Sequence, residues 1–286
     1  MPDIDIRTTG RAGRITLTRS KALNALSYEM CMAIDTALRN WREDDEVDLI
    51  ILDAEGDKAF CAGGDIAKLY ETGRAGDFSH GQTFWRDEYR LNALIFAYPK
   101  PIISFLQGFT MGGGVGIGCH GTHRVVGETS KISMPECAIG LVPDVGGSLM
   151  LALAPGRLGE YLGLTAFRMG PADAIYAGFA DHFIPQATWP DLIELLEASG
   201  NAELVTDHAQ PAPGGKLQQM QPEIDQCFAG ETLEDILITL RSEDTDFPLK
   251  ALEMMAKLSR DCTCEDGVFQ RHVVSPPRAN EAYVLI

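Results

Sequence analysis

The chain of 286 residues lacks any apolar run long enough to cross a bilayer. Its longest apolar stretches, such as 94–98 and 102–106, fall far short of the ~20 residues that a membrane-spanning helix needs. The first ten residues lack the basic-then-apolar order of a secretory signal. The seven cysteines are scattered, without the spacing of a disulfide framework. These absences indicate reduced thiols, and we expect a cytoplasmic protein that does not contact a membrane.

A basic stripe is also missing, since 41 acidic residues against 24 Lys and Arg give a formal net charge of −17. Binding to nucleic acid needs clustered positive charge, so we expect no nucleic-acid partner. A small anionic ligand is not excluded, because the local placement of Lys and Arg matters more than the total.

Two kinds of catalytic site are missing as well. No Gly-x-Ser-x-Gly motif occurs, which argues against a serine-nucleophile thioesterase. The pairs His120 with His123 and Cys262 with Cys264 do not have the spacing of a zinc site and lack further partners. We therefore expect no metal.

The stretch 111–147 carries the strongest functional pattern that is present. It reads MGGGVGIGCHGTHRVVGETSKISMPECAIGLVPDVGG, with a triple glycine near its start and two acids, Glu136 and Asp144, near its end. Glycine has no Cβ, so the N–H groups of such a run can approach a ligand closely. The apolar run before it, 101–106, predicts a buried strand that leads into the turn. A buried strand, a glycine turn and then two acids is an order typical of a ligand-binding or catalytic site.

Hydrophobic periodicity predicts alternating strands and helices in the first two thirds of the chain, as in an α/β protein. The first two strands alternate apolar and polar residues around glycines, as in a hairpin, and Ser27 is expected to cap the first helix. We expect strands at 4–7, 14–18, 48–52 and 102–106, and helices at 27–42 and 84–97. Strand patterns end after Ile184, so we place a domain change near residue 190 with a helical region beyond it.

Two glycine turns, at 60–65 and 110–116, each follow a buried strand. If the strands are neighbours, the turns lie side by side, and one amide from each could donate to a single carbonyl oxygen. Such an oxyanion hole stabilises charge developing on an acyl group, and each donor lowers the barrier by ~3–4 kcal/mol. The alternative is that the glycines only permit tight turns and close packing. The pair of turns, the second leading to two acids, favours the oxyanion hole.

Three motifs together resemble the enoyl-CoA hydratase/isomerase (crotonase) superfamily: 61–65 (CAGGD), 111–116 (MGGGVG) and 134–147 (MPECAIGLVPDVGG). Within it the chain is most similar to the 3-hydroxyisobutyryl-CoA hydrolase branch. The resemblance implies a crotonase-type spiral of ββα units over residues 1–190 and a smaller helical region over 191–286. It also implies an acyl-CoA substrate held by its carbonyl, with no cofactor besides the CoA of the substrate. A homo-oligomer is expected, since this superfamily often forms them.

The resemblance also implies roles for individual residues. The backbone N–H groups of Gly64 and Gly113 would form the oxyanion hole, and Glu88 would touch the substrate. Glu136 and Asp144 match the catalytic acids of the hydrolase branch.

One position departs from the hydratases. They carry a glutamate three residues after the second oxyanion glycine, where this chain has Gly116. The departure argues against water addition by two glutamates and supports hydrolysis.

The chemistry of thioester hydrolysis fits these acids. Glu136 could attack the carbonyl or activate a water, and Asp144 could orient that water or donate a proton. Two carboxylates in an apolar pocket do not easily ionise together, so one of them should keep its proton near neutrality. The structural alternative is that each acid caps a short helix, one starting at Cys137 and one after Gly147.

The phosphates of CoA call for nearby positive charge. Lys21, Lys58 and Lys68 are the candidates nearest the two turns, although each could equally be a solvated surface lysine. A literal G-x-G-x-x-G at 116–121 could suggest a dinucleotide site, but 108–114 separates it from the preceding strand.

We therefore expect a hydrolase of short branched 3-hydroxyacyl-CoA thioesters, with 3-hydroxyisobutyryl-CoA as the substrate that the resemblance implies. The alternatives are an enoyl-CoA hydratase or isomerase and a non-catalytic acyl-CoA-binding or assembly subunit. The last is suggested by the residues after about 259, which lack helical periodicity and predict a shortened or altered C-terminus.

Overall fold

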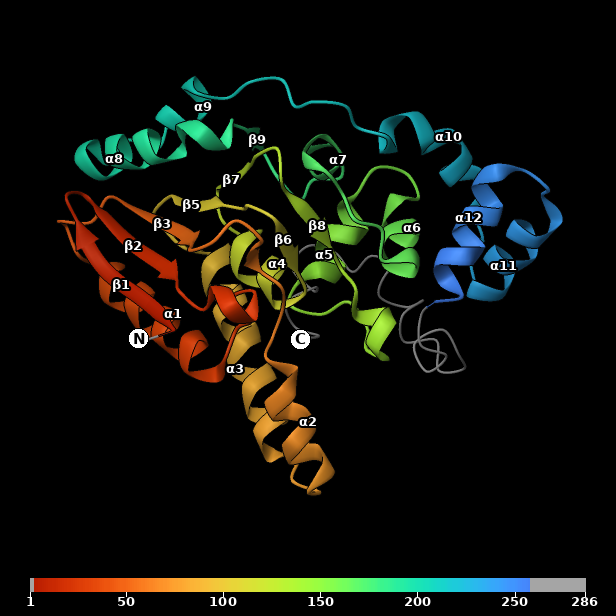
Figure 1. The fold of residues 1–286 in the computed structure, drawn as a ribbon, viewed down its shortest axis with the longest axis horizontal. Helices are drawn as coiled ribbons and strands as arrows, with labels where there is room; N and C mark the ends of the chain where they lie inside the picture. The colour runs from red at the N-terminus through yellow and green to blue at the C-terminus, as the bar shows by residue number, and fades with distance from the viewer. Residues whose placement is uncertain (1–2, 258–286) are drawn as a thin grey trace.

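The computed structural model describes residues 3–257 of the chain, and two sheets organise them (Figure 1). The larger sheet has the strand order β1-β2-β3-β5-β7-β9, and the smaller has the order β4-β6-β8. Only β1 and β2 pair antiparallel, as the predicted hairpin; all other named strand pairs are parallel. The larger sheet comprises β1 (Ile4–Thr9), β2 (Ala12–Leu17), β3 (Leu49–Ala54), β5 (Ile102–Phe105), β7 (His123–Val126) and β9 (His182–Phe183), and the smaller comprises β4 (Ala59–Cys61), β6 (Phe109–Met111) and β8 (Lys131–Ser133).

From β3 onward, successive strands alternate between the two sheets. Each of β3, β5 and β7 is followed by a short strand of the smaller sheet and then by helical structure, which is the ββα order predicted for the crotonase-type spiral. The helices are α1 (Tyr28–Trp41), α2 (Ile66–Arg74), α3 (Ser79–Phe96), α4 (Gly113–Gly118), α5 (Gly147–Leu153), α6 (Leu158–Thr165), α7 (Pro171–Tyr176), α8 (Trp189–Ser199), α9 (Leu204–Asp207), α10 (Leu217–Cys227), α11 (Leu233–Ser242) and α12 (Asp246–Met255), with 3-10 turns η1 (Ser20–Ala22), η2 (Glu136–Ile139) and η3 (Gln186–Thr188).

The two predicted helices are present, and the second begins earlier than predicted. Ser27 caps α1, because its side chain accepts from the N–H of Met30 at 3.2 Å. Helix α3 begins at Ser79, where the side chain of Asp77 accepts from the Ser79 N–H at 2.9 Å. The first turn of α3 is largely polar, so periodicity alone did not reveal it.

The central strands are buried on both faces, which explains their continuous apolar sequence. Ile50 and Leu52 face the main core with α1 and α3, whereas Leu49 and Ile51 face a second cluster formed with α8 and α9.

Beyond β9 the described chain contains helices and no further named strand. Helix α8 packs on the larger sheet, and α10 and α12 contact α6 at the other end (Figure 1). The domain division near residue 190 stays a prediction, and the altered segment predicted after about 259 lies outside the described residues. Within residues 3–257, no helix is both long enough and apolar enough to cross a membrane.

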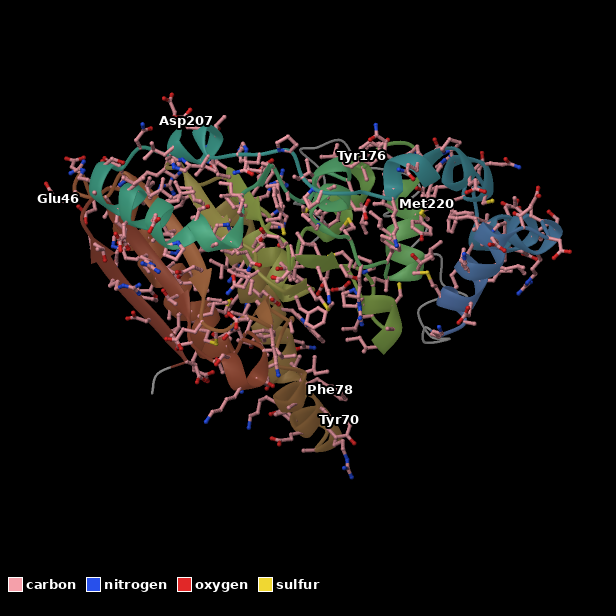
Figure 2. All side chains as sticks on the ribbon, turned by 45° about the horizontal axis from the view of Figure 1, so that its top comes forward. Glu46, Tyr70, Phe78, Tyr176, Asp207 and Met220 are labelled. Carbon is pink, nitrogen blue, oxygen red and sulfur yellow. The ribbon has the colours of Figure 1, made fainter. Side chains whose placement is uncertain are left out.

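Helix α2 and the start of α3 protrude from the body. Figure 2 shows Tyr70 and Phe78 near the end of this protrusion, and both side chains are largely exposed. The base of α2 faces the other way, because Ile66 and Leu69 line a cavity beside the glycine turns. The protrusion therefore forms one wall of that cavity.

Helix α4 packs so closely on β4 that a side chain would not fit between them. A Cβ on Gly114 would lie 2.1 Å from the carbonyl oxygen of Cys61, and one on Gly118 would lie 2.7 Å from the ring of Phe60. The glycines of this helix are thus required by packing, as well as by the turn before it.

Gly114→Ala should lower the free energy of unfolding by about 2 kcal/mol or more, because the added methyl group overlaps the backbone of β4. Gly73→Ala in α2 is the matched control: its Cβ would meet nothing nearer than 4.0 Å, and alanine favours a helix by up to about 1 kcal/mol. Urea unfolding of both variants measures the difference. Equal midpoints would show that close packing does not require glycine at position 114.

Candidate active site

The two glycine turns lie side by side, as the sequence predicted. Strands β4 and β6 pair in parallel, so the turns that follow them leave the same edge of the smaller sheet. A Cβ on Gly113 would lie 3.2 Å from the backbone nitrogen of Gly64.

The strands that deliver the turns differ from those we expected. The predicted strands, β3 and β5, belong to the larger sheet, and the chain crosses to the smaller sheet before each turn. Gly56 and Gly108, with φ of +87° and +57°, lie in these crossings. A Cβ on Gly108 would lie 2.1 Å from the carbonyl oxygen of Lys58, so this crossing requires glycine.

Each of the two turns has one backbone N–H group, that of Gly64 or of Gly113, that can donate to a ligand. Gly63 and Gly112 have φ of +114° and +49°, which favour glycine. The Leu26 N–H donates to the carbonyl of Gly63 at 2.8 Å and fixes the first turn. Gly113 is the first residue of α4, where an N–H has no acceptor within the helix. Across residues 3–257, no carbonyl accepts from the N–H of Gly64 or Gly113.

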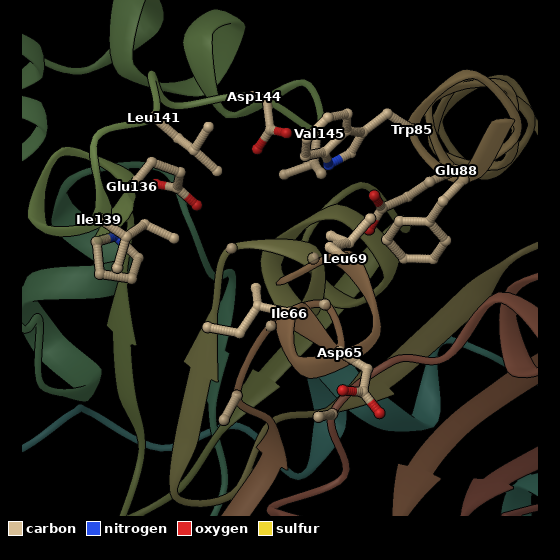
Figure 3. Close-up of a pocket in the computed structure, with 18 of the residues that line it drawn as sticks. Asp65, Ile66, Leu69, Trp85, Glu88, Glu136, Ile139, Leu141, Asp144 and Val145 are labelled. Atoms are coloured by element: carbon tan, nitrogen blue, oxygen red, sulfur yellow. The ribbon is translucent and has the colours of Figure 1, made fainter. Parts of the chain in front are cut away.

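A cavity of about 410 Å³ lies against the turns. Most of its wall is apolar, and Figure 3 shows the carboxyl groups of Glu88, Glu136 and Asp144 pointing into the same space from different sides. The lining residues are Ala25, Ala62, Gly63, Gly64, Asp65, Ile66, Ala67, Leu69, Phe84, Trp85, Glu88, Gly112, Gly113, Pro135, Glu136, Ala138, Ile139, Leu141, Asp144 and Val145. The five residues predicted for the oxyanion hole, the substrate contact and the catalytic acids are therefore brought together.

Glu88 lies on α3 with its side chain against the second turn. It is only 2% exposed, and a Cβ on Gly113 would lie 2.7 Å from its Oε1. Among the described residues, this buried oxygen has no hydrogen-bond partner. Burial, and then the negative charge of Asp144, raise the pKa of Glu88 to about 8. At neutral pH this carboxyl group holds a proton and can donate it to a ligand.

Asp144 lies in the loop between η2 and α5. The hydroxyl of Tyr89 donates to its Oδ2 at 2.6 Å. Burial raises the pKa of Asp144, and the hydrogen bond from Tyr89 opposes that rise. Burial also raises the pKa of Tyr89, so Tyr89 stays a phenol that can donate. We expected one of Glu136 and Asp144 to stay protonated near neutral pH. The raised pKa of Glu88 makes Glu88 a further acid that can hold this proton.

Glu136 is the first residue of η2 and is 4% exposed. A Cβ on Gly112 would lie 2.8 Å from its Oε1, so the carboxyl group sits directly over the second turn. The capping alternative is wrong for both acids. The N-cap positions of η2 and α5 are Pro135 and Gly146, so neither acid is a cap.

The residue after Asp144 is held in an unusual conformation. Val145 has φ of +47°, which is rare for a β-branched residue and costs roughly 1–3 kcal/mol. The Nε2 of His120 lies 2.7 Å from the Val145 carbonyl, which can only accept, so this nitrogen carries the hydrogen. Burial lowers the pKa of His120, which keeps the ring neutral. These contacts fix the backbone that carries Asp144.

Val145 also explains why position 116 is glycine. A Cβ on Gly116 would lie 2.8 Å from both the Cβ of Val145 and the amide nitrogen of Asn92. The place where the hydratases carry a glutamate is therefore filled by other side chains. The G-x-G-x-x-G pattern begins inside α4 rather than directly after a strand, so the dinucleotide alternative lacks its structural context.

Tyr89 and His120 were not predicted to act at the site. Tyr89 is 55 positions from Asp144, and His120 is 25 positions from Val145, so no local pattern joins them. The position of Tyr89 beside Glu88 on a helix was the one clue in the sequence.

The three lysines proposed for CoA are exposed, and none of them lines the cavity. The Nζ of Lys68 lies 3.9 Å from the Oε2 of Glu71, three residues further along α2. Their roles stay predictions. Within residues 3–257 no group of three His, Cys, Asp or Glu side chains could hold a metal ion, and Cys262 and Cys264 lie outside that range.

Comparison with known proteins supplies the family. The family described as enoyl-CoA hydratase/isomerase matches residues 12–265. A Danio rerio protein named 3-hydroxyisobutyryl-CoA hydrolase, mitochondrial, is 41% identical over 261 residues, which are 87% of this chain and 68% of that protein. The Homo sapiens protein of the same name is 37% identical over 268 residues, 90% of this chain and 69% of that protein.

Solved structures agree on the fold under different names. One described as an enoyl-CoA hydratase from Rhodobacter sphaeroides is 57% identical with a TM-score of 0.85, covering 92% of this chain and 77% of that chain. One described as a carnitinyl-CoA dehydratase from Mycobacterium thermoresistibile is 36% identical with a TM-score of 0.88, covering 99% of this chain and 84% of that chain. The chain thus belongs to the enoyl-CoA hydratase/isomerase (crotonase) family and, within it, is similar to the proteins named 3-hydroxyisobutyryl-CoA hydrolase.

Proposed function

We propose that this protein hydrolyses the CoA thioester of a short branched 3-hydroxy acid, with 3-hydroxyisobutyryl-CoA as the best candidate. The observation that carries the proposal is the grouping of Glu88, Glu136 and Asp144 around the N–H groups of Gly64 and Gly113 in one largely apolar cavity. The names of relatives about 40% identical support the same reaction.

The thioester carbonyl would bind at the two glycine turns. The N–H groups of Gly64 and Gly113 would both donate to its oxygen, which becomes negatively charged as the carbonyl is attacked. Donors fixed by the backbone, in a largely apolar cavity, stabilise this charge more strongly than solvent does.

Hydrolysis adds water across the C–S bond, with OH bonding to the acyl carbon and a proton going to the sulfur of CoA. Glu136, which lies over the second turn, would attack the carbonyl itself or take the proton of the attacking water. Asp144 would orient that water or pass a proton toward the leaving thiolate.

Glu88 would bind the 3-hydroxyl group of the acyl chain. Its buried, protonated carboxyl can both donate to and accept from a hydroxyl. A substrate without that hydroxyl would leave this buried group without a partner, which disfavours binding.

An enoyl-CoA hydratase or isomerase is the second candidate, because the similar solved structures carry hydratase and dehydratase names. The filled space at Gly116 disfavours it, since Val145 and Asn92 leave no room for a second glutamate. The cluster of buried acids likewise disfavours the third candidate, a non-catalytic acyl-CoA-binding or assembly subunit. The relatives are named mitochondrial, and a cytoplasmic location and a homo-oligomer stay predictions for this chain.

The first test is a substrate panel. Free thiol should appear with 3-hydroxyisobutyryl-CoA, and isobutyryl-CoA, which lacks the hydroxyl, should react ~10²-fold more slowly or worse. Crotonyl-CoA should show no loss of its enoyl absorbance. Hydration of crotonyl-CoA without thiol release would select the hydratase instead, and CoA-ester binding with neither reaction would select the non-catalytic subunit.

Glu136→Gln should reduce kcat by ~10²–10⁴-fold while the Kd for the CoA ester changes little, because the amide keeps the shape but cannot act as nucleophile or base. Thiol release and calorimetric binding measure the two quantities. Glu194→Gln, at an exposed position on α8, is the control and should match the wild type. Normal turnover by Glu136→Gln would remove Glu136 from the mechanism.

The pH dependence tests the proton on Glu88. Its pKa is raised to about 8, so the carboxyl is protonated below that pH, and wild-type kcat/KM should fall as pH rises through about 8. Glu88→Gln keeps a neutral donor at all pH values, so its profile should lack this alkaline fall. Profiles corrected for spontaneous thioester hydrolysis measure both. The same fall in wild type and variant would assign it to another group.

A further inference from the structure

We propose that Tyr89 is a positioning residue for this hydrolysis: it holds Asp144 as an anion with one oxygen directed into the cavity, so that Glu88 becomes the acid that carries the proton. The inference rests on the proposed function and adds to it a residue that does not touch the substrate.

Tyr89 acts on Asp144 through one short contact. Its hydroxyl donates to the Oδ2 of Asp144 at 2.6 Å. Figure 3 shows the Asp144 carboxyl group directed into the cavity, whereas Tyr89 is not among the residues that line it. We therefore expect Tyr89 to act on the reaction through Asp144, to which it donates its hydrogen bond.

Asp144 and Glu88, which share the cavity, differ in their hydrogen bonds. Asp144 accepts a hydrogen bond from Tyr89, whereas the buried Oε1 of Glu88 has no partner among residues 3–257. Like charges at close range in an apolar cavity do not easily coexist, so one proton is shared between the two acids. A hydrogen bond to one anion favours placing that proton on the other acid.

Two contacts favour the anion of Asp144: first the hydroxyl of Tyr89, and then the backbone N–H of Asp144 itself. The ionisable groups that interact with Tyr89 are Asp144, Glu88 from α3 and Glu136 from η2. In the described part of the chain, no Lys, Arg or His forms an ion pair with Asp144. Adjacent to Asp144, His120 fixes the carbonyl of Val145, so the backbone and the side chain are held by separate contacts.

Tyr89→Phe tests the role, because it removes the hydroxyl and keeps the ring. Without the hydrogen bond the anion of Asp144 is less stable, so its pKa rises and the acidic limb of the kcat profile moves to higher pH by about one to two units. At pH values on the shifted acidic limb, kcat of Tyr89→Phe should be tenfold or more below that of the wild type, and KM should change less than about twofold.

Tyr28→Phe is the matched control. Tyr28 donates to Asp87 at 3.0 Å, a second Tyr–Asp pair that involves α3 but lies outside the cavity lining. Its profile should superimpose on that of the wild type. If the two variants have the same acidic limb, Tyr89 does not position Asp144.

A readout without substrate separates this inference from the proposed function. In protein labelled with ¹³C at the Asp carboxyl carbons, the Asp144 signal is identified by its loss in Asp144→Asn, and its titration should move to higher pH in Tyr89→Phe. An unmoved titration overturns the role of Tyr89 whether or not the wild type hydrolyses thioesters. A shifted titration in a protein that releases no thiol supports the pairing and overturns the proposed function alone.

A double variant completes the test. If Tyr89 acts only through Asp144, adding Tyr89→Phe to Asp144→Asn should change kcat by less than about twofold, since the two effects do not add when one residue works through the other. A further large loss in the double variant would show that Tyr89 acts on the packing of α3, and would overturn the positioning role.

Discussion

The close approach of two backbone turns is the constraint on which the rest of the structure depends. The ends of β4 and β6 bring Gly64 and Gly113 so near each other that a Cβ on one would almost touch the backbone of its neighbour. Two N–H groups can converge on one oxygen only at such a distance. The pairing of β4 with β6 in the smaller sheet places these two ends side by side.

The arrangement of the acids around the turns lowers the stability of the folded protein. Three carboxyl groups face a largely apolar cavity, and the loop that carries Asp144 contains Val145 in a conformation that costs energy. Specific contacts offset these costs: the hydroxyl of Tyr89 donates to Asp144, and the ring of His120 donates to the carbonyl of Val145. Burial raises the pKa of Glu88 to about 8, which avoids a further buried charge at neutral pH. Strain and buried charge concentrated at one point are expected where binding and chemistry require a fixed geometry.

Patterns in the sequence predicted the long elements well. The continuous apolar run of β3 and the three- and four-residue periodicity of α1 are direct consequences of burial on two faces and on one face. Strands β4, β6 and β8 were not separated from their neighbours, because strands of three residues are too short to show a period. The first turn of α3 escaped notice because it is largely polar and so shows no apolar periodicity.

The sequence by itself determined the chemistry available: two glycine turns, the acids at 88, 136 and 144, and a glycine at 116 in place of a carboxylate. Residue identity sets which groups can donate, accept or ionise, and motif spacing sets the family. Only the tertiary structure decided which acids are buried together and which side chains support them. Those outcomes depend on burial and on contacts such as Tyr89 with Asp144 and His120 with Val145, which join distant parts of the chain in space.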